Sequence, residues 1–166
     1  MIYFIGAGPG AADLITVKGK ELLEKADLVI YAGSLVNPEL LKYCKPECTI
    51  MNSATMTLEE VIAAMVPPAQ AGQLVVRLHT GDPSVYGAHR EQIDLLRSYN
   101  LDYEVVPGVS SFCAAVACLK AEYTLPNVSQ SVIITRMEGR TPVPSHQKIA
   151  AYAAHNATMV LVLSRA

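Results

Sequence analysis

The residue types best suited to chemistry stand together at positions 79–83 (HTGDP), directly after the mostly apolar run 74–78 (LVVRL). A buried strand that ends in such a turn leaves backbone amides and loop side chains free to face a ligand. Asp82 and Thr80 can hydrogen-bond polar groups of that ligand, and His79 stands at the strand end. Asp82 could also serve as the N-cap of a following helix, and the two roles are compatible. The stretch therefore predicts a binding site after a strand.

A second candidate loop, residues 6–11 (GAGPGA), follows the apolar run 2–5 (IYFI). It formally fits the dinucleotide fingerprint G-x-G-x-x-A. Two details weigh against that reading. Pro9 has no N–H to offer a pyrophosphate, and the next apolar run ends in 31–33 (YAG) without an acid for a ribose hydroxyl. A nucleotide-binding oxidoreductase stays open as an alternative, as does a purely structural loop that lets the chain turn tightly.

The elements that must position these loops recur in a regular order. Short apolar runs bounded by turn residues predict strands at 2–5, 28–31, 48–51, 74–78 and 103–106. Apolar residues at helical spacing predict helices at 16–25, 36–43, 57–66, 85–99 and 111–119. Pro67 and Pro68 are expected to end the third of these helices at Val66. The order predicts an α/β fold, with a five-stranded, mostly parallel sheet covered by helices on both faces.

The pattern changes after residue 121. Residues 122–129 (EYTLPNVS) form a connection, and they precede an expected strand at 131–135, a helix at 145–154 and a strand at 158–163. A single helix can cover only one face of a sheet formed by these two strands, so the other face would stay exposed. We therefore expect residues 1–121 to form an amino-terminal α/β domain, and residues 122–166 to be the start of a second α/β domain that is incomplete in this chain.

Composition narrows the class of protein. The 166 residues are 51% hydrophobic and 17% charged, with a formal net charge of −2. This balance indicates a large core and no nucleic-acid partner. The four cysteines lack metal-ligand spacing, so no metal site is expected. No apolar run reaches the ~20 residues of a membrane span, and no leader sequence is visible. We expect a cytoplasmic protein without a membrane partner.

Three stretches stand in a distinctive order: residues 5–10 (IGAGPG), 77–87 (RLHTGDPSVYG) and 105–111 (VVPGVSS). In that order and spacing they resemble the tetrapyrrole (corrin/porphyrin) methylases, the S-adenosylmethionine-dependent enzymes of corrin and sirohaem synthesis. The likeness extends over essentially the whole chain. Residues 31–36 (YAGSLV) and 135–144 (TRMEGRTPVP) are most similar to the branch that methylates precorrin-4 or cobalt-precorrin-4 at C-11.

The resemblance also separates this chain from the uroporphyrinogen-methylating relatives. Those relatives carry an Asp just after the second strand and a Lys after the third. The matching positions here are Ala32 and the segment 52–54 (NSA). Both departures favour the corrin-pathway branch.

The resemblance implies two α/β domains, a homodimer, and a site for S-adenosylmethionine, which becomes S-adenosylhomocysteine after methyl transfer. By matched position, the cofactor contacts would fall on Pro9, Thr80, Gly81, Asp82, Val85, Ser110, Ser111 and Leu163. The polar members suit the ribose and amino-acid groups of the cofactor. Val85 and Leu163 could line an apolar slot for its adenine.

The implied substrate, a precorrin, carries many carboxylates, so hydrogen-bond donors are expected around it. The candidates are the backbone amides of Gly6, Gly8 and Gly10, the side chains of His79 and Arg136, and the ring of Tyr86 as a stacking surface. Arg77, Arg90 and Arg140 are further candidates, although each charge could simply be solvated. His89, His146 and His155 are expected on exposed helix faces.

The chemistry of methyl transfer from a sulfonium depends on in-line positioning of a carbon nucleophile. No catalytic triad is visible, and no catalytic residue is assigned. The sequence predicts a methyltransferase of cobalamin biosynthesis that acts on C-11 of precorrin-4 or cobalt-precorrin-4. The oxidoreductase and an inactive, shortened fragment of the methylase remain alternatives.

Overall fold

The computed structural model describes residues 1–139 and 141–163, except for the side chain of Ser34. The chain divides into two compact units, Met1–Ala114 and Ala115–Ala166. The division into domains at residues 121 and 122 that the sequence suggests stays a prediction.

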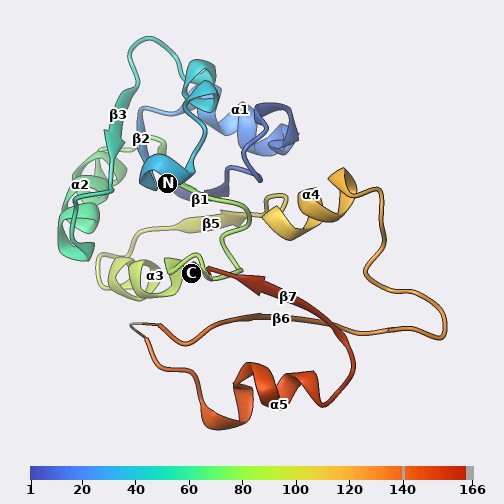
Figure 1. The fold of residues 1–166 in the computed structure, drawn as a ribbon. Coiled ribbons are helices and arrows are strands. Elements are labelled where there is room, and N and C mark those ends of the chain that lie inside the picture. Colours follow the sequence, from blue (N-terminus) through green and yellow to red (C-terminus); the bar gives the residue numbers. More distant parts are fainter. Residues whose placement is uncertain (140, 164–166) are drawn as a thin grey trace. The chain divides into compact units, whose positions relative to one another are not determined.

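A five-stranded sheet forms the centre of the first unit (Figure 1). Its order is β3-β2-β4-β1-β5, and every pairing is parallel. The strands are β1 (Ile2–Gly6), β2 (Leu28–Tyr31), β3 (Thr49–Asn52), β4 (Val75–His79) and β5 (Tyr103–Val106). The predicted α/β class and parallel sheet are confirmed. Because all the strands run the same way, their carboxyl ends meet at one edge of the sheet.

Helices cover both faces of this sheet, as the sequence predicts. On one face, Phe4 and Ile30 pack with α2 (Leu58–Gln70) and α3 (His89–Arg97). On the other face, Ile5 and Val29 pack with α1 (Val17–Lys25) and with the 3-10 helix Pro38–Tyr43. Strand residues thus alternate between two apolar layers, each closed by its own helices.

The predicted start of α2 is confirmed, but its predicted end is wrong. Thr57 and Glu60 form a reciprocal capping box, with bonds of 3.2 and 2.7 Å between side chains and backbone. The helix then continues through Pro67 and Pro68 to Gln70. The two prolines lack donors, but their carbonyls accept bonds of 3.0 Å each from the amides that follow. Buried Ala69 keeps this last turn on the core.

The helix expected at 85–99 begins only at His89. Tyr86 and Ala88 have φ angles of 55° and 50°, which a continuous right-handed helix does not allow. Residues 83–88 therefore form a turn before α3. The helix expected at 36–43 is likewise shorter and of the 3-10 type.

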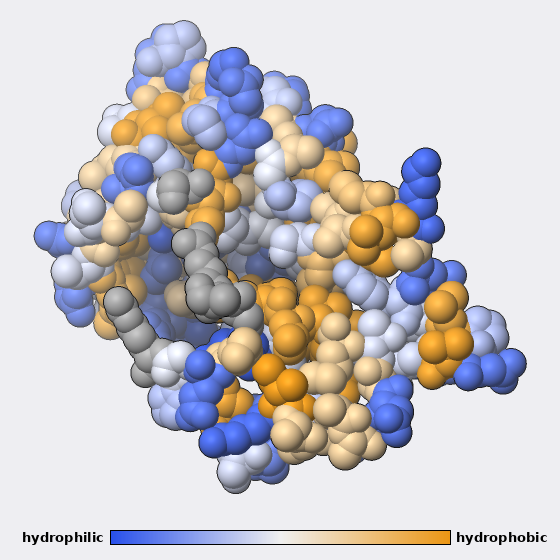
Figure 2. Space-filling view, viewed as in Figure 1, coloured by the Kyte–Doolittle hydropathy of each residue, from blue (hydrophilic) through white to orange (hydrophobic). Residues whose placement is uncertain are grey.

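The second unit contains a parallel pair of strands, β6 (Val132–Arg136) and β7 (Thr158–Val162). The helix predicted between them divides at Lys148 into the 3-10 helix Ser145–Gln147 and α5 (Ile149–Ala153). Helix α4 (Ser111–Cys118) crosses the boundary between the units. Figure 2 shows hydrophobic residues at the surface where Figure 1 draws these strands. Ile134 on β6 and Leu161 on β7 are both exposed. Over the described residues, no helix has the length and apolar character to cross a membrane.

Candidate functional site

Three backbone loops meet at the carboxyl edge of the first unit's sheet. Gly8 and Gly81 exchange two backbone hydrogen bonds, of 3.2 and 2.9 Å, between the loops after β1 and β4. A Cβ on Gly6 would lie 2.5 Å from the Gly81 carbonyl oxygen and 2.6 Å from the Gly108 Cα atom. Only glycine permits this approach of the loops after β1, β4 and β5. The three motifs singled out in the sequence are therefore neighbours in space.

Asp82 ties two of these loops together. One carboxylate oxygen accepts the Ser84 N–H at 2.7 Å, and the other accepts the Gly108 N–H at 2.9 Å. The carboxylate therefore stabilises the turn after β4 and fixes the loop after β5 beside it. It does not cap α3, which begins seven residues later, at His89. Each oxygen keeps a lone pair that could accept a ligand donor.

Most of the residues predicted to contact the cofactor are brought together. Thr80, Gly81, Asp82 and Val85 share the loop after β4, and a Cβ on Gly81 would lie 3.7 Å from both the Ser110 Cα and the Ser111 amide nitrogen. Pro9 lies in the loop after β1, whose neighbour Gly8 bonds Gly81. Leu163 belongs to the second unit, where it follows β7 and is 68% exposed. The roles of all eight residues stay predictions.

Arg77 is not placed to meet a substrate carboxylate, because it is buried on β4. Its Nη1 donates to the Ile30 carbonyl at 3.1 Å, and its Nε donates to the Gln92 Oε1 at 3.2 Å. Burial lowers the pKa of this guanidinium to about 10, so it stays charged at neutral pH.

His79 is also buried, with 3% of its surface exposed. Burial, with Arg77 and His89 nearby, lowers the pKa of its imidazole to about 3, so the ring is neutral at pH 7. The Nε2 atom of the ring has no hydrogen-bond partner among the described residues. Its contact with a substrate stays a prediction, which this burial does not favour.

The sequence missed two members of this buried group, Gln92 and His89. His89 was expected on an exposed face, but it is partly buried, and its ring lies 6.0 Å from Phe4 and 6.2 Å from His79. Gln92 lies one position before Ile93 on the buried face of α3. A polar residue among the apolar positions of that helix was the available signal. The other two histidines, His146 and His155, are exposed as predicted.

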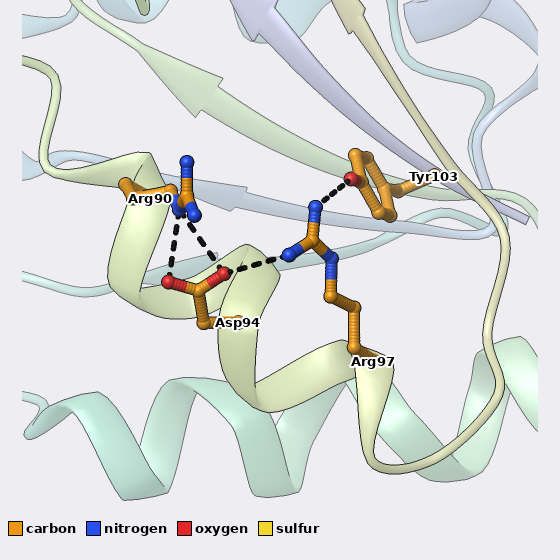
Figure 3. A network of polar contacts seen from close by, with 4 residues as sticks. All are labelled: Arg90, Asp94, Arg97 and Tyr103. Carbon is orange, nitrogen blue, oxygen red and sulfur yellow. Dashed lines mark hydrogen bonds and ion pairs between the residues drawn. The ribbon is translucent and has the colours of Figure 1, made fainter.

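The remaining residues predicted to contact the substrate include two arginines that bond other parts of the chain and one exposed tyrosine. Figure 3 shows Arg90 with both of its carboxylate contacts on Asp94, at 2.9 and 3.0 Å. Arg136 donates to the carbonyls of Met137, Thr141 and Pro142 at 3.1–3.2 Å, which organises the loop after β6. Tyr86 is 46% exposed. Arg140 lies outside the described residues. The substrate roles of Gly6, Gly8, Gly10, Tyr86 and Arg136 stay predictions.

The glycine loop does not form the dinucleotide arrangement. That arrangement places the pyrophosphate at a helix N-terminus directly after the loop. Here a short 3-10 helix, Ala12–Leu14, follows the loop, and α1 begins only at Val17. The Gly10 carbonyl is instead held by the Asn37 side-chain amide at 2.6 Å.

A cavity of about 480 Å³ opens elsewhere, near the amino ends of β2 and β3. Asp27, Lys45 and Thr49 are among the residues that line it, and the predicted site residues are not. The described part of the chain holds no cluster of three or more metal-ligating side chains.

Comparison with known proteins gives a consistent result. The family described as Tetrapyrrole (Corrin/Porphyrin) Methylases matches residues 1–166. The cobalt-precorrin-4 C(11)-methyltransferase of Methanocaldococcus jannaschii is 57% identical over 98% of this chain and 62% of its own length. That of Priestia megaterium is 50% identical over 98% of this chain and 63% of its own length. The chain thus spans less than two thirds of these relatives.

Solved structures agree. An X-ray structure of a cobalt precorrin-4 methyltransferase matches with a TM-score of 0.94 at 50% identity, over 98% of this chain and 68% of that one. A uroporphyrin-III C-methyltransferase of Thermus thermophilus, complexed with S-adenyl homocysteine, matches with a TM-score of 0.70 at 29% identity, over 87% of this chain and 59% of that one. These comparisons give the oxidoreductase alternative no support.

Proposed function

The chain belongs to the tetrapyrrole methylase family, and we propose that it acts as an S-adenosylmethionine-dependent C-methyltransferase of cobalamin biosynthesis. The acceptor would be C-11 of precorrin-4 or cobalt-precorrin-4. One observation carries this proposal: two relatives named for the C-11 reaction are 57% and 50% identical over 98% of the chain. Identity at this level over all three site loops favours a shared reaction.

The donor set at the sheet edge fits the proposed cofactor. Hydroxyls on Thr80 and Ser110 suit ribose oxygens, and the Asp82 carboxylate suits an ammonium or hydroxyl group. S-adenosylmethionine, when bound, supplies a methyl group that its sulfonium already activates. Pro9, Gly81, Val85, Ser111 and Leu163 complete the proposed contacts.

The residues of the chain would then act by binding and orientation. The paired loops of Gly8 and Gly81 are rigid, because two backbone bonds and close glycine contacts fix them. Rigid loops can hold donor and acceptor in line, which is the main requirement for this transfer. Gly6, Gly8 and Gly10 and the side chains of Arg136 and Tyr86 are the proposed contacts for the tetrapyrrole. The Gly8 N–H already donates to the Gly81 carbonyl, so Gly8 would contribute its backbone surface and not a donor.

Three further statements belong to this proposal. The active protein would be a homodimer, it would work in the cytoplasm, and its domains would divide at residues 121 and 122. The homodimer and the presence of two domains are supported by the likeness of the chain to the methylase family, whereas the division at residues 121 and 122 is supported by the change of sequence pattern there.

The proposal is tested by calorimetric titration of the chain with S-adenosylhomocysteine and, separately, with NADPH. We expect the first to bind and the second not to bind. A methyl-transfer assay with precorrin-4 and isotopically labelled S-adenosylmethionine then tests the reaction itself, and label should enter the tetrapyrrole. Tighter binding of NADPH than of S-adenosylhomocysteine would overturn the proposed function.

A further inference from the structure

Three buried polar side chains join β4 to the start of α3. Arg77 donates to the Ile30 carbonyl and to Gln92. Gln92 in turn donates from its Nε2 to the Ala88 carbonyl at 3.3 Å. His79, two residues further along β4, lies beside the ring of His89, the first residue of α3, with ring centroids 6.2 Å apart. A hydrogen-bonded path and a ring contact therefore lead from the sheet to the start of α3.

Burying the Arg77 guanidinium in this arrangement costs folding free energy. Arg77 is 7% exposed, and none of the described residues forms an ion pair with it. A buried charge without a counterion is strongly unfavourable unless other interactions offset it. Leucine or methionine at this position would fill the layer between sheet and helix without that cost. The buried charge therefore points to a role beyond packing.

The segment that receives these bonds is strained. Tyr86 and Ala88 lie in the left-handed region, with φ angles of 55° and 50°. A Cβ on Gly87 would lie 2.9 Å from the Pro83 Cα atom and closer still to the Pro83 carbonyl. Ala88 is the N-cap of α3 and has no side-chain cap. Strained residues persist only where the surrounding structure over-determines them. The bond from Gln92 to the Ala88 carbonyl supplies such a restraint, and the His79 ring beside His89 adds packing at the same place.

The turn at residues 83–88 continues directly from the candidate site. The Val85 amide donates to the Asp82 carbonyl at 3.2 Å, and Asp82 holds the loop after β5. Within the turn, Tyr86 is 46% exposed. An exposed aromatic ring on a strained turn offers a flat apolar face on which a conjugated macrocycle can stack.

We propose, on the basis of the function above, that Arg77, Gln92 and His79 are positioning residues that hold the 83–88 turn so that Tyr86 receives the tetrapyrrole acceptor. They set the affinity for the acceptor and affect the affinity for the methyl donor much less, because Val85 is one of eight proposed cofactor contacts. His79 acts through its contact with His89 at the start of α3 and does not itself contact the substrate.

The test uses substitutions of Gln92 in the full chain. Gln92→Glu keeps an acceptor for Arg77 but removes the donor to the Ala88 carbonyl. Glu91→Gln is the matched control, because Glu91 is the exposed neighbour on the same helix. Uroporphyrin III serves as a stable carboxylated tetrapyrrole, titrated by its visible absorbance. S-adenosylhomocysteine is titrated by calorimetry, and hydrogen exchange reports on the amides of residues 84–88.

We expect Gln92→Glu to raise the Kd for uroporphyrin III at least tenfold and to speed exchange at residues 84–88 at least tenfold. The Kd for S-adenosylhomocysteine should rise less than threefold, because Val85 is one of its eight proposed contacts. Tyr86→Ala should cause a similar loss for uroporphyrin III. The double variant should lose little more than either single variant, because both changes act on the same contact. Ala88→Gly, which relieves the left-handed strain, should restore part of the affinity in the Gln92→Glu background.

The outcomes separate the two proposals. If the unmodified chain binds neither ligand, the proposed function fails, and this inference fails with it. If the unmodified chain binds both ligands and Gln92→Glu binds both equally well, only the positioning role is overturned. Additive losses in the double variant, an equal loss of S-adenosylhomocysteine affinity, or binding of S-adenosylhomocysteine without uroporphyrin III would also overturn it.

Discussion

The carboxylate of Asp82 shows how one side chain can serve both fold and site. Each of its oxygens accepts one backbone N–H, from Ser84 and from Gly108. We expect Asp82→Asn to cost about 1 kcal/mol of stability, because its single carbonyl oxygen can keep only one bond. Asp82→Ala should cost roughly 2–3 kcal/mol, because it leaves both amides without an acceptor. Urea denaturation measures both values.

The control for this prediction is Asp13→Ala, at an exposed aspartate in the first turn of a 3-10 helix. It should change the free energy of unfolding by less than about 0.5 kcal/mol. Equal losses for Asp82→Ala and Asp13→Ala would show that the bridge between the loops contributes nothing to stability.

The buried imidazole of His79 predicts a pH-dependent stability. Its pKa is about 3 in the folded chain, against an ordinary value of 6.5. Between these values the unfolded chain binds a proton that the folded chain does not, so stability falls as pH falls from 6.5 toward 3. The slope from this group approaches about 1.4 kcal/mol per pH unit. We expect His79→Gln to flatten the measured slope between pH 6.5 and 4.5.

Exposed His155 provides a control for the substitution itself, since His155→Gln should change the free energy of unfolding at pH 7 by less than about 0.5 kcal/mol. Asp27 also makes the stability of the chain fall with falling pH, because the hydrogen bond from Lys45 lowers the pKa of its carboxyl group. That contribution is lost at lower pH than the contribution of His79. A wild-type slope in His79→Gln would mean that the buried ring does not resist protonation.

At the scale of the elements, the three glycines at the sheet edge decide how closely β1, β4 and β5 can approach. A Cβ on Gly108 would lie 2.7 Å from the Gly6 Cα atom, and nearer still to the Gly81 carbonyl oxygen. Both neighbours are backbone, which cannot rotate away. We expect Gly108→Ala to destabilise the chain by about 3 kcal/mol and to weaken S-adenosylhomocysteine binding. Thermal unfolding and calorimetry measure these two effects.

Gly139→Ala is the corresponding control, because nothing lies within 4 Å of the added Cβ and the residue has no positive φ. Its melting temperature should match that of the unmodified chain within about 1 °C. A melting temperature of Gly108→Ala equal to that of the unmodified chain would show that the three loops can accommodate the added methyl group.

The elements also show where sequence patterns succeed. Strands β2 and β5 begin and end at the predicted residues, because short apolar runs bounded by turn residues are typical of buried strands. The end of α2 was mispredicted, because a buried Ala69 outweighs the missing amides of two prolines. The start of α3 was mispredicted because apolar spacing says nothing of the left-handed residues Tyr86 and Ala88.

At the scale of the whole chain, the sequence predicted the α/β class, and the family resemblance predicted which loops meet. Local patterns could not predict the path from Arg77 through Gln92 to Ala88, because it joins a strand to a helix 15 residues later through side chains that look like surface residues. Buried polar groups of this kind become visible only when the tertiary fold closes over them.

The two units of the chain should differ in local stability. In the first unit, β4 is paired on both sides, by β2 and β1, and all five of its residues are buried. Among the described residues of the second unit, β7 pairs with β6 alone, and Leu161 on that strand is 46% exposed. Amides in a two-stranded pair with little buried surface open by local fluctuation, whereas amides in a covered central strand open only with the whole unit.

We therefore expect hydrogen exchange to protect residues 75–79 at least a hundredfold more strongly than residues 158–162 when the chain is monomeric at low concentration. A second copy that paired with the exposed strands would slow exchange in β7, because unpaired strand edges readily add another strand. Protection of β7 should then rise with protein concentration while that of β4 stays constant. Equal protection of the two strands in dilute, monomeric chain would contradict this difference, and would mean that the parallel pair β6–β7 is stable by itself.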